Sequence, residues 1–187
     1  MNIRRMIRIL AAVAVIGCLY MAPAMALTPF HETDAAVEID YSQLDNETAV
    51  YTYLTQEMGL NRAAACGVLA NIQYESGFDP TVWGDGGTSH GLCQWHNDRC
   101  WNLSRFCREN GYDENSVYGQ MAYLQTELTE HYPAVLEYLQ SVEDSEDGAY
   151  DAAWYWCYYF EVPADRQNQA ALRGESAAYT YYPAYAD

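Results

Sequence analysis

Apolar residues recur every three or four positions through most of the chain, the spacing that places side chains on one face of a helix. The first such stripe begins near Asn46 and ends at Gly59, because glycine commonly follows the last turn of a helix. A second helix is expected over residues 62–74, after Asn61, a good helix-capping residue. Its small and apolar side chains predict a closely packed, buried helix.

The pattern breaks after this helix and then returns. Residues 81–89 contain three glycines and show no periodicity, so a loop or a small β-hairpin is expected between residues 81 and 95. Helical spacing resumes in four segments, which are residues 98–110, 116–132, 133–139 and 150–160. The chain is therefore predicted to form a mainly α, single globular domain with at most a small β-hairpin.

The N-terminal segment differs in composition from the rest of the chain. Three arginines precede an apolar run over residues 9–20, and the small residues Ala24 and Ala26 offer a signal peptidase its preferred site. Residues 1–26 are therefore predicted to be a signal peptide, followed by an acidic linker over 27–45 and a folded domain over 46–187. A lipoprotein signal, with Cys18 as the lipidated residue, is the alternative. Both predict export, to the medium or to the cell surface and wall space.

The charge of the chain excludes some partners. The formal net charge is −17, the sequence has no lysine, and removal of the three signal-peptide arginines would bring the charge to about −20. Such a surface repels nucleic acids and anionic membranes, so no nucleic-acid partner is expected. An anionic cell wall would also be repelled, which favours attachment through a wall or secretion-apparatus protein. The domain itself is expected to be a monomer.

Cysteine chemistry offers two further interpretations, neither of them favoured. Five cysteines remain after the signal peptide, namely Cys66, Cys93, Cys100, Cys107 and Cys157. Five cannot all pair, and buried free thiols are expected for several of them. Cys93, His96, Cys100 and Cys107 have the ligand types of a zinc site, but no metal and no cofactor is expected. A cysteine nucleophile paired with His90 or His96 would indicate a peptidase, yet no cysteine has the sequence context of those families.

Glu75 lies at the end of the expected buried helix, just before the chain turns into the glycine-rich loop. Glycoside hydrolysis needs a carboxylic acid that keeps its proton near neutral pH, and burial against apolar groups produces such an acid. The negative end of a helix also disfavours a carboxylate. Glu75 is therefore a candidate general acid, although a glutamate at a helix end is usually a solvated surface residue.

Four separated sequence motifs support Glu75 as a candidate acid. They are ESGFDP at 75–80, SHGLCQW at 89–95, GQMAYLQTEL at 119–128 and YYFEVP at 158–163. In this order they resemble the phage-tail-type lysozyme family, over about residues 46–160, and more distantly the goose-type lysozymes and soluble lytic transglycosylases. The resemblance implies a lysozyme-like α+β fold, peptidoglycan glycan strands as substrate, cleavage of the β-1,4 bond after N-acetylmuramic acid, and Glu75 as the general acid.

The resemblance also implies substrate-binding positions. The Gly-Leu-x-Gln segment lines the sugar cleft in relatives, where glycine lets the backbone approach the glycan and Gln94 offers donor and acceptor groups. A late segment returns to the cleft in relatives, and its aromatic rings can stack on sugars. The residues expected to bind substrate or support Glu75 are Ser76, Ser89, Gly91, Leu92, Gln94, Trp95, Tyr159 and Glu161. Packing is the alternative role for Gln94, Trp95 and Tyr159.

A second carboxylate decides the mechanism, since an inverting hydrolase needs a base that positions water, whereas a transglycosylase manages with one glutamate. Asp85 is the leading candidate, because goose-type enzymes also place an aspartate in this loop; a turn-forming role is its alternative. A second aspartate of those enzymes aligns with His96, which leaves water activation open. Asp98 and Glu127 are weaker candidates. The alternatives to a muramidase are a lytic transglycosylase and an inactive wall-binding or assembly module.

Overall fold

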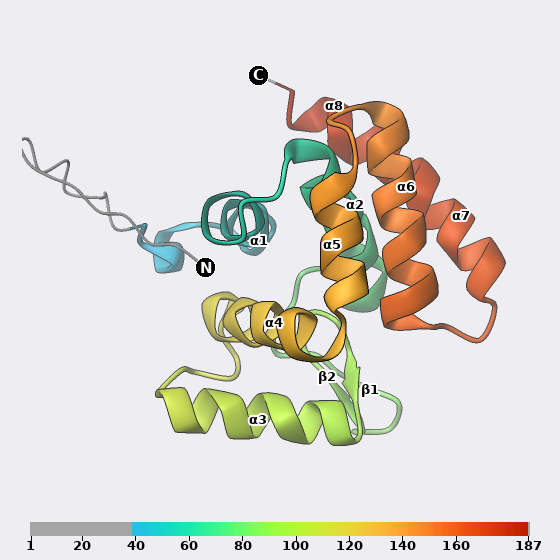
Figure 1. The fold of residues 1–187 in the computed structure, drawn as a ribbon. Helices are drawn as coiled ribbons and strands as arrows, with labels where there is room; N and C mark the ends of the chain where they lie inside the picture. The colour runs from blue at the N-terminus through green and yellow to red at the C-terminus, as the bar shows by residue number, and fades with distance from the viewer. Residues whose placement is uncertain (1–38, 187) are drawn as a thin grey trace, which may run out of the picture. The chain divides into compact units, whose positions relative to one another are not determined.

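Helices dominate residues 39–186, the part of the chain that the computed structural model describes (Figure 1). These residues belong to one compact unit. The predicted signal peptide, Cys18 and the first part of the predicted linker lie outside the described residues. The later part of that linker already contacts the domain, because Tyr41 packs against the rings of Tyr53 and Tyr118.

The helices follow the apolar pattern closely. In chain order they are η1 (Tyr41–Gln43), α1 (Asn46–Thr52), η2 (Tyr53–Glu57), α2 (Arg62–Ser76), α3 (Asp98–Asn110), α4 (Val117–His131), α5 (Pro133–Ser141), α6 (Glu146–Trp156), η3 (Cys157–Glu161), α7 (Arg166–Ser176), η4 (Ala177–Tyr181) and α8 (Tyr182–Ala184). The prediction of a mainly α, lysozyme-like fold is confirmed. The sequence prediction was incomplete after residue 160, because α7, η4 and α8 were not anticipated.

The glycine-rich segment forms a small antiparallel sheet of three strands rather than a single hairpin. The strands are β1 (Trp83–Gly84), β2 (Ser89–His90) and β3 (Trp95–His96), in the order β1-β2-β3. Strand β2 is central, pairing Trp83 with His90 on one side and His90 with Trp95 on the other. The tight turns between these strands use backbone in the left-handed region, including Asp85 and Gln94.

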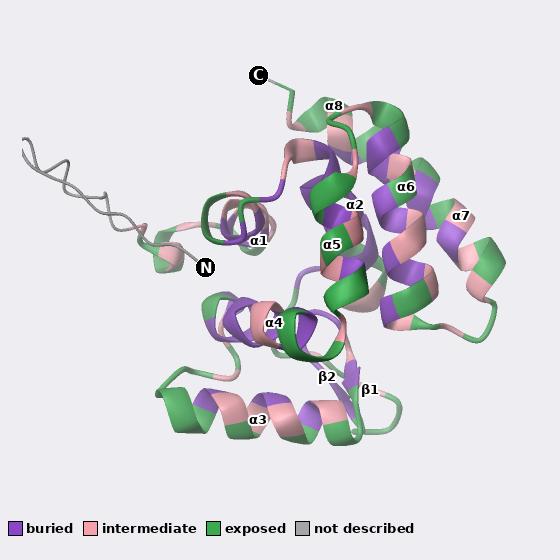
Figure 2. Ribbon diagram, in the orientation of Figure 1, coloured by how far each residue is buried: buried purple, intermediate pink, exposed green. Residues whose placement is uncertain are grey.

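Helix α2 is the buried centre of the domain, and Figure 2 shows most of its length as buried. Its small residues let α6 approach closely, since a Cβ atom at Gly67 would lie 2.6 Å from the Cβ of Ala152. Asn71 links the two helices, because its amide nitrogen donates to the carbonyl oxygens of Gly67 and Ala153. In Figure 1, α7 lies beside α6, while α3 and α4 lie together with the sheet. The prediction of a closely packed central helix is confirmed.

All five cysteines in the described part of the chain are free and buried. Burial raises the pKa of the thiols, most strongly at Cys93. A raised thiol pKa disfavours the nucleophilic thiolate, so the peptidase interpretation is not supported. None of the helices that the structure describes is both long enough and apolar enough to span a membrane.

Candidate active site

Glu75 lies in the last turn of α2, where Gly77 adopts the left-handed conformation that ends the helix. Its side chain keeps 19% of its surface exposed. Arg173 Nη1 donates to Glu75 Oε1 at 2.6 Å and to Asn71 Oδ1 at 3.1 Å. The sequence analysis expected apolar surroundings for this carboxyl group. That expectation was wrong, because a nearly buried guanidinium, with 6% of its surface exposed, is its main contact.

Arg173 was missed because no helix was predicted after residue 160. Helix α7 reaches the site because Gly174 allows close contact with α6: a Cβ atom there would lie 2.7 Å from the Tyr150 ring. A buried arginine is stable only with partners, and Arg173 has Glu75 and Asn71. One signal in the sequence could have indicated this helix. Ala170 and Gly174 are small residues four positions apart, the spacing of one helix face, and Arg173 lies between them.

Glu161 is the second carboxyl group of the site, at the end of η3. Trp156 Nε1 donates to its Oε1 at 2.9 Å. Burial raises the pKa of Glu161 to about 8, and the neighbouring charge of Glu75 adds to the rise, while Arg99 and Arg173 oppose it. The structure thus brings Glu161 into the electrostatic neighbourhood of Glu75, and its raised pKa favours the protonated form.

The buried carboxyl group of Glu161 makes the stability of the protein depend on pH. The pKa of Glu161 in the folded protein is higher than its value of 4.5 in the unfolded chain. The protonated side chain therefore contributes its full stability below about pH 4.5, and this contribution is lost as the pH rises toward 8. Glu161→Gln keeps an acceptor for Trp156 but does not titrate. We therefore expect the variant to exceed the wild type in free energy of unfolding by at least about 1 kcal/mol at pH 8.5, and by less at pH 4.5.

Urea denaturation of both proteins at the two pH values measures this difference. Glu137→Gln, an exposed site on α5, is the matched control and should show no such trend. A difference between Glu161→Gln and wild type that does not grow with pH would contradict the assignment of the proton to Glu161.

Asp85, Ser89 and His96 form a cluster on the sheet. Ser89 Oγ donates to Asp85 Oδ2 at 2.6 Å and lies 3.0 Å from His96 Nδ1. His96 Nδ1 is also 3.6 Å from Asp85 Oδ2, and both side chains are more than half exposed. Ser89 is buried and serves this cluster rather than presenting its hydroxyl group to solvent. Asp85 also turns the chain with a positive φ of 49°, so its turn-forming role is compatible with a chemical one.

Gly91 and Leu92 have structural roles, and the burial of both residues does not support the predicted contact with substrate. Gly91 has a φ of 75°, and a Cβ atom there would lie 2.5 Å from the amide group of Gln120. Gln120 accepts from the Leu92 backbone N–H at 2.8 Å and donates to the Pro80 carbonyl oxygen at 2.7 Å. The glycine therefore admits a buried glutamine side chain, and the fully buried Leu92 belongs to the core.

Trp95 and Gln94 also hold the structure together. Trp95 is fully buried and its Nε1 donates to Glu127 Oε2 at 2.8 Å. Glu127 is buried and forms a two-point ion pair with Arg99, at 2.8 and 3.0 Å. Its oxygens are fully used, so Glu127 is not a base for water. The amide nitrogen of Gln94 donates to the Gly91 carbonyl oxygen at 3.0 Å. For both residues the packing alternative fits the geometry.

The remaining predicted residues are divided between structural and accessible positions. Ser76 donates to the Ile72 carbonyl oxygen of its own helix at 3.3 Å. Among the described residues, this hydroxyl group forms no hydrogen bond with Glu75. Tyr159 is 48% exposed and its ring lies beside those of Tyr155 and Tyr158. It is therefore available to a ligand. Within the described residues, no group of three or more histidine, cysteine or acidic side chains is arranged to hold a metal ion.

A central helix that ends in an accessible glutamate, next to a small sheet and within a mainly α domain, defines the class of lysozyme-like proteins. The family model described as phage tail lysozyme matches residues 45–184. The chain therefore belongs to the phage tail lysozyme family, as the sequence motifs predicted, and it has the lysozyme-like, peptidoglycan-lytic character of that family. Comparison with curated proteins gives no match.

Proposed function

We propose that this protein is a muramidase that cleaves the β-1,4 bond between N-acetylmuramic acid and N-acetylglucosamine in peptidoglycan, with Glu75 as the general acid. The observation that carries the proposal is the geometry at Glu75. Arg173 fixes Oε1, while Oε2 has no hydrogen-bond partner among the residues that the structure describes. Oε2 is therefore the oxygen that can carry the proton to the glycosidic oxygen.

Arg173 and Glu161 support this role in different ways. When Glu75 gives up its proton, the carboxylate that forms already accepts a charge-assisted hydrogen bond from Arg173, so the guanidinium stabilises charge that develops in the transition state. Burial and the charge of Glu75 raise the pKa of Glu161, so Glu161 stays neutral once Glu75 has become a carboxylate. A neutral Glu161 adds no second negative charge that would compete for Arg173. Proton transfer and charge stabilisation are thus divided between Glu75 and Arg173, while Glu161 stays neutral.

Water is the proposed acceptor of the sugar, and the cluster of Asp85, Ser89 and His96 supports this choice. An exposed carboxylate beside an exposed imidazole can accept a proton from an attacking water molecule. His96 then takes the part that the resemblance gives to a second aspartate in goose-type enzymes.

A lytic transglycosylase is the second candidate function, and one observation favours it. Asp85 Oδ2 already accepts from Ser89 at 2.6 Å, and the residue forms a tight turn. A carboxylate oxygen engaged in this way is less available to position water, which would leave the 6-hydroxyl group of muramic acid to attack in place of water.

Mass analysis of digested peptidoglycan tests the proposal. We expect muropeptides with reducing N-acetylmuramic acid ends, because water is consumed at each cleavage. Anhydro-muramyl ends, lighter by one water, would assign the transglycosylase instead. Release of no fragments by a folded wild-type protein would contradict both and leave a wall-binding or assembly module. For the enzyme to meet its substrate, we propose export by the N-terminal signal and attachment to the wall through a partner protein.

A further inference from the structure

A pocket of about 760 Å³ lies between the turn that joins β1 to β2 and the outer face of α3. Its lining comes from Trp83, Gly87, Thr88, Asn97, Asp98, Cys100, Trp101, Ser104, Arg105 and Arg108. This volume is typical of pockets that hold small organic ligands. Neither Glu75, Arg173 nor Glu161 lines the pocket, so the proposed catalytic chemistry does not account for it.

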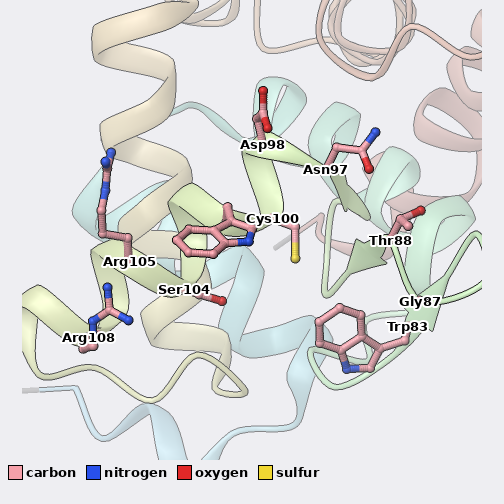
Figure 3. A pocket seen from close by; sticks show the side chains of 10 residues that line it. Trp83, Gly87, Thr88, Asn97, Asp98, Cys100, Ser104, Arg105 and Arg108 are labelled. Atoms are coloured by element: carbon pink, nitrogen blue, oxygen red, sulfur yellow. The ribbon is translucent and has the colours of Figure 1, made fainter.

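Two unpaired arginines distinguish this pocket in a strongly acidic chain. Among the six arginines that the structure describes, three form ion pairs and Arg166 lies over the ring of Tyr158. Arg105 and Arg108 have no ion pair and no hydrogen bond within the described residues. Both are exposed and line the same pocket. Figure 3 shows them along one side of it, with Thr88 and Trp83 on the other.

Helical spacing explains why these side chains gather. Trp101, Arg105 and Arg108 are separated by four and three residues on α3, so they share one face of the helix. With 26 acidic residues in the chain, two neighbouring positive charges without a carboxylate partner leave a local site for an anion. The arginine fork matches the two oxygens of a carboxylate.

Two exposed tryptophans supply the apolar part of the pocket. Trp83 is 53% exposed and Trp101 is 75% exposed, although large aromatic side chains are usually well buried. Trp83 is held in place by stacking on the buried ring of His90, with the ring centres 4.2 Å apart. A fixed, exposed indole is suited to pack against the flat apolar face of a sugar ring, and Thr88, Asn97 and Ser104 provide groups for its hydroxyls.

We propose that this pocket binds a muramyl sugar together with the stem peptide that it carries. The tryptophans contact the sugar, and Arg105 and Arg108 bind a carboxylate of the peptide. The inference rests on the proposed function, because peptidoglycan is the substrate that joins an N-acetylated sugar to an anionic peptide. Asp98 lies at the other end of the face, about 10 Å along the axis from Arg105. The carboxylate therefore binds at the arginine end and sugar hydroxyls at the aspartate end.

Such a site makes the enzyme prefer glycan strands that still carry their peptides. It also offsets the repulsion between an acidic protein and an acidic wall, since the two arginines attract the substrate where the rest of the surface does not.

Calorimetric titration with the disaccharide N-acetylglucosaminyl-N-acetylmuramic acid tests the proposal. This disaccharide lacks the bond that the proposed muramidase cleaves, so binding is measured without turnover. Three probes are compared: the disaccharide with its stem peptide, the disaccharide with its lactyl carboxyl group amidated, and the free stem peptide. We expect the wild type to bind the peptide-bearing disaccharide about tenfold more tightly than either other probe.

The variants divide the two parts of the site. Arg105→Ser/Arg108→Ser should remove the preference for the peptide-bearing disaccharide and leave affinity for the amidated one unchanged, whereas Trp101→Ala should weaken both. Arg166→Ser also removes a positive charge, but outside the pocket, and should keep the preference. Trp101, Arg105 and Arg108 are exposed and Arg166 is half-buried, and circular dichroism confirms that each variant is folded.

Equal affinity of the wild type for the two disaccharides would overturn the proposal, as would an equal loss of preference in Arg166→Ser. Binding of the free peptide as tightly as the peptide-bearing disaccharide would also overturn it, because the tryptophans would then contribute nothing. A wild type that binds selectively yet cleaves no peptidoglycan would instead contradict the proposed function and leave the pocket assignment standing.

Discussion

Glu75→Gln is expected to lower the rate of peptidoglycan cleavage by about 10³-fold, the usual contribution of a general acid. Glutamine has the same shape and still offers an oxygen to Arg173, whose Nη1 lies 2.6 Å from Glu75 Oε1 in the wild type. The variant therefore keeps the hydrogen bond that links α7 to α2, and it loses only the proton that the reaction needs. Release of muropeptides, followed by mass spectrometry, measures the effect.

The matched control is Glu137→Gln, which changes the same charge at an exposed position on α5. It should leave the rate within about twofold of wild type, because Glu137 is exposed and substitutions at exposed positions usually have small effects. Substrate binding by Glu75→Gln should also persist, since the carboxyl group acts on the transition state. A Glu75→Gln variant that releases muropeptides as fast as Glu137→Gln would rule out Glu75 as the acid.

Glu127→Ala is expected to lower the free energy of unfolding by about 3–5 kcal/mol, because it leaves the Arg99 guanidinium, whose side chain is only 24% exposed, without its partner. Arg99 donates two hydrogen bonds to Glu127, and Trp95 and Tyr123 donate one each. The side chain of Glu127 is only 2% exposed, so water cannot replace these contacts. Denaturation by urea, followed by circular dichroism, measures the loss.

Glu130→Ala removes the same carboxylate one turn later on α4, where the side chain is 62% exposed. It should change stability by no more than about 0.5 kcal/mol. Glu127→Gln should fall between the two alanine variants, because the amide oxygen still accepts from Trp95 but does not neutralise Arg99. Similar stability of Glu127→Ala and Glu130→Ala would show that the buried ion pair contributes little.

These two predictions separate two carboxylates that look alike in the sequence. Glu75 and Glu127 both lie late in helices of similar apolar character and both meet an arginine. Their difference is exposure: 19% of the Glu75 side chain reaches solvent, against 2% for Glu127. Only the former can meet a glycan. Sequence analysis kept Glu127 as a weak candidate base because exposure cannot be read from helical spacing.

The sequence motifs were sufficient for the fold class and the family, but less so for the roles of single residues. Gly91, Leu92 and Trp95 were assigned to the sugar cleft, and all three are buried in the domain. The motif marks the segment that builds the sheet beside the site. It does not distinguish a residue that shapes the backbone, as Gly91 does for Gln120, from one that touches a ligand.

Local sequence patterns were enough to predict the helices up to residue 160, the break between α2 and α3, and the position of Glu75 at the end of the central helix. These features depend on local spacing, on caps and on glycine, and such signals lie within a few residues of one another. Only the tertiary structure decided what surrounds Glu75. Arg173 is 98 residues away in the chain and Glu161 is 86 residues away, and burial between packed helices sets their charge and contacts. Long-range packing leaves no periodic trace in the sequence, which is why Arg173 was missed and Glu161 was expected near Glu75 only through the resemblance to the lysozyme family.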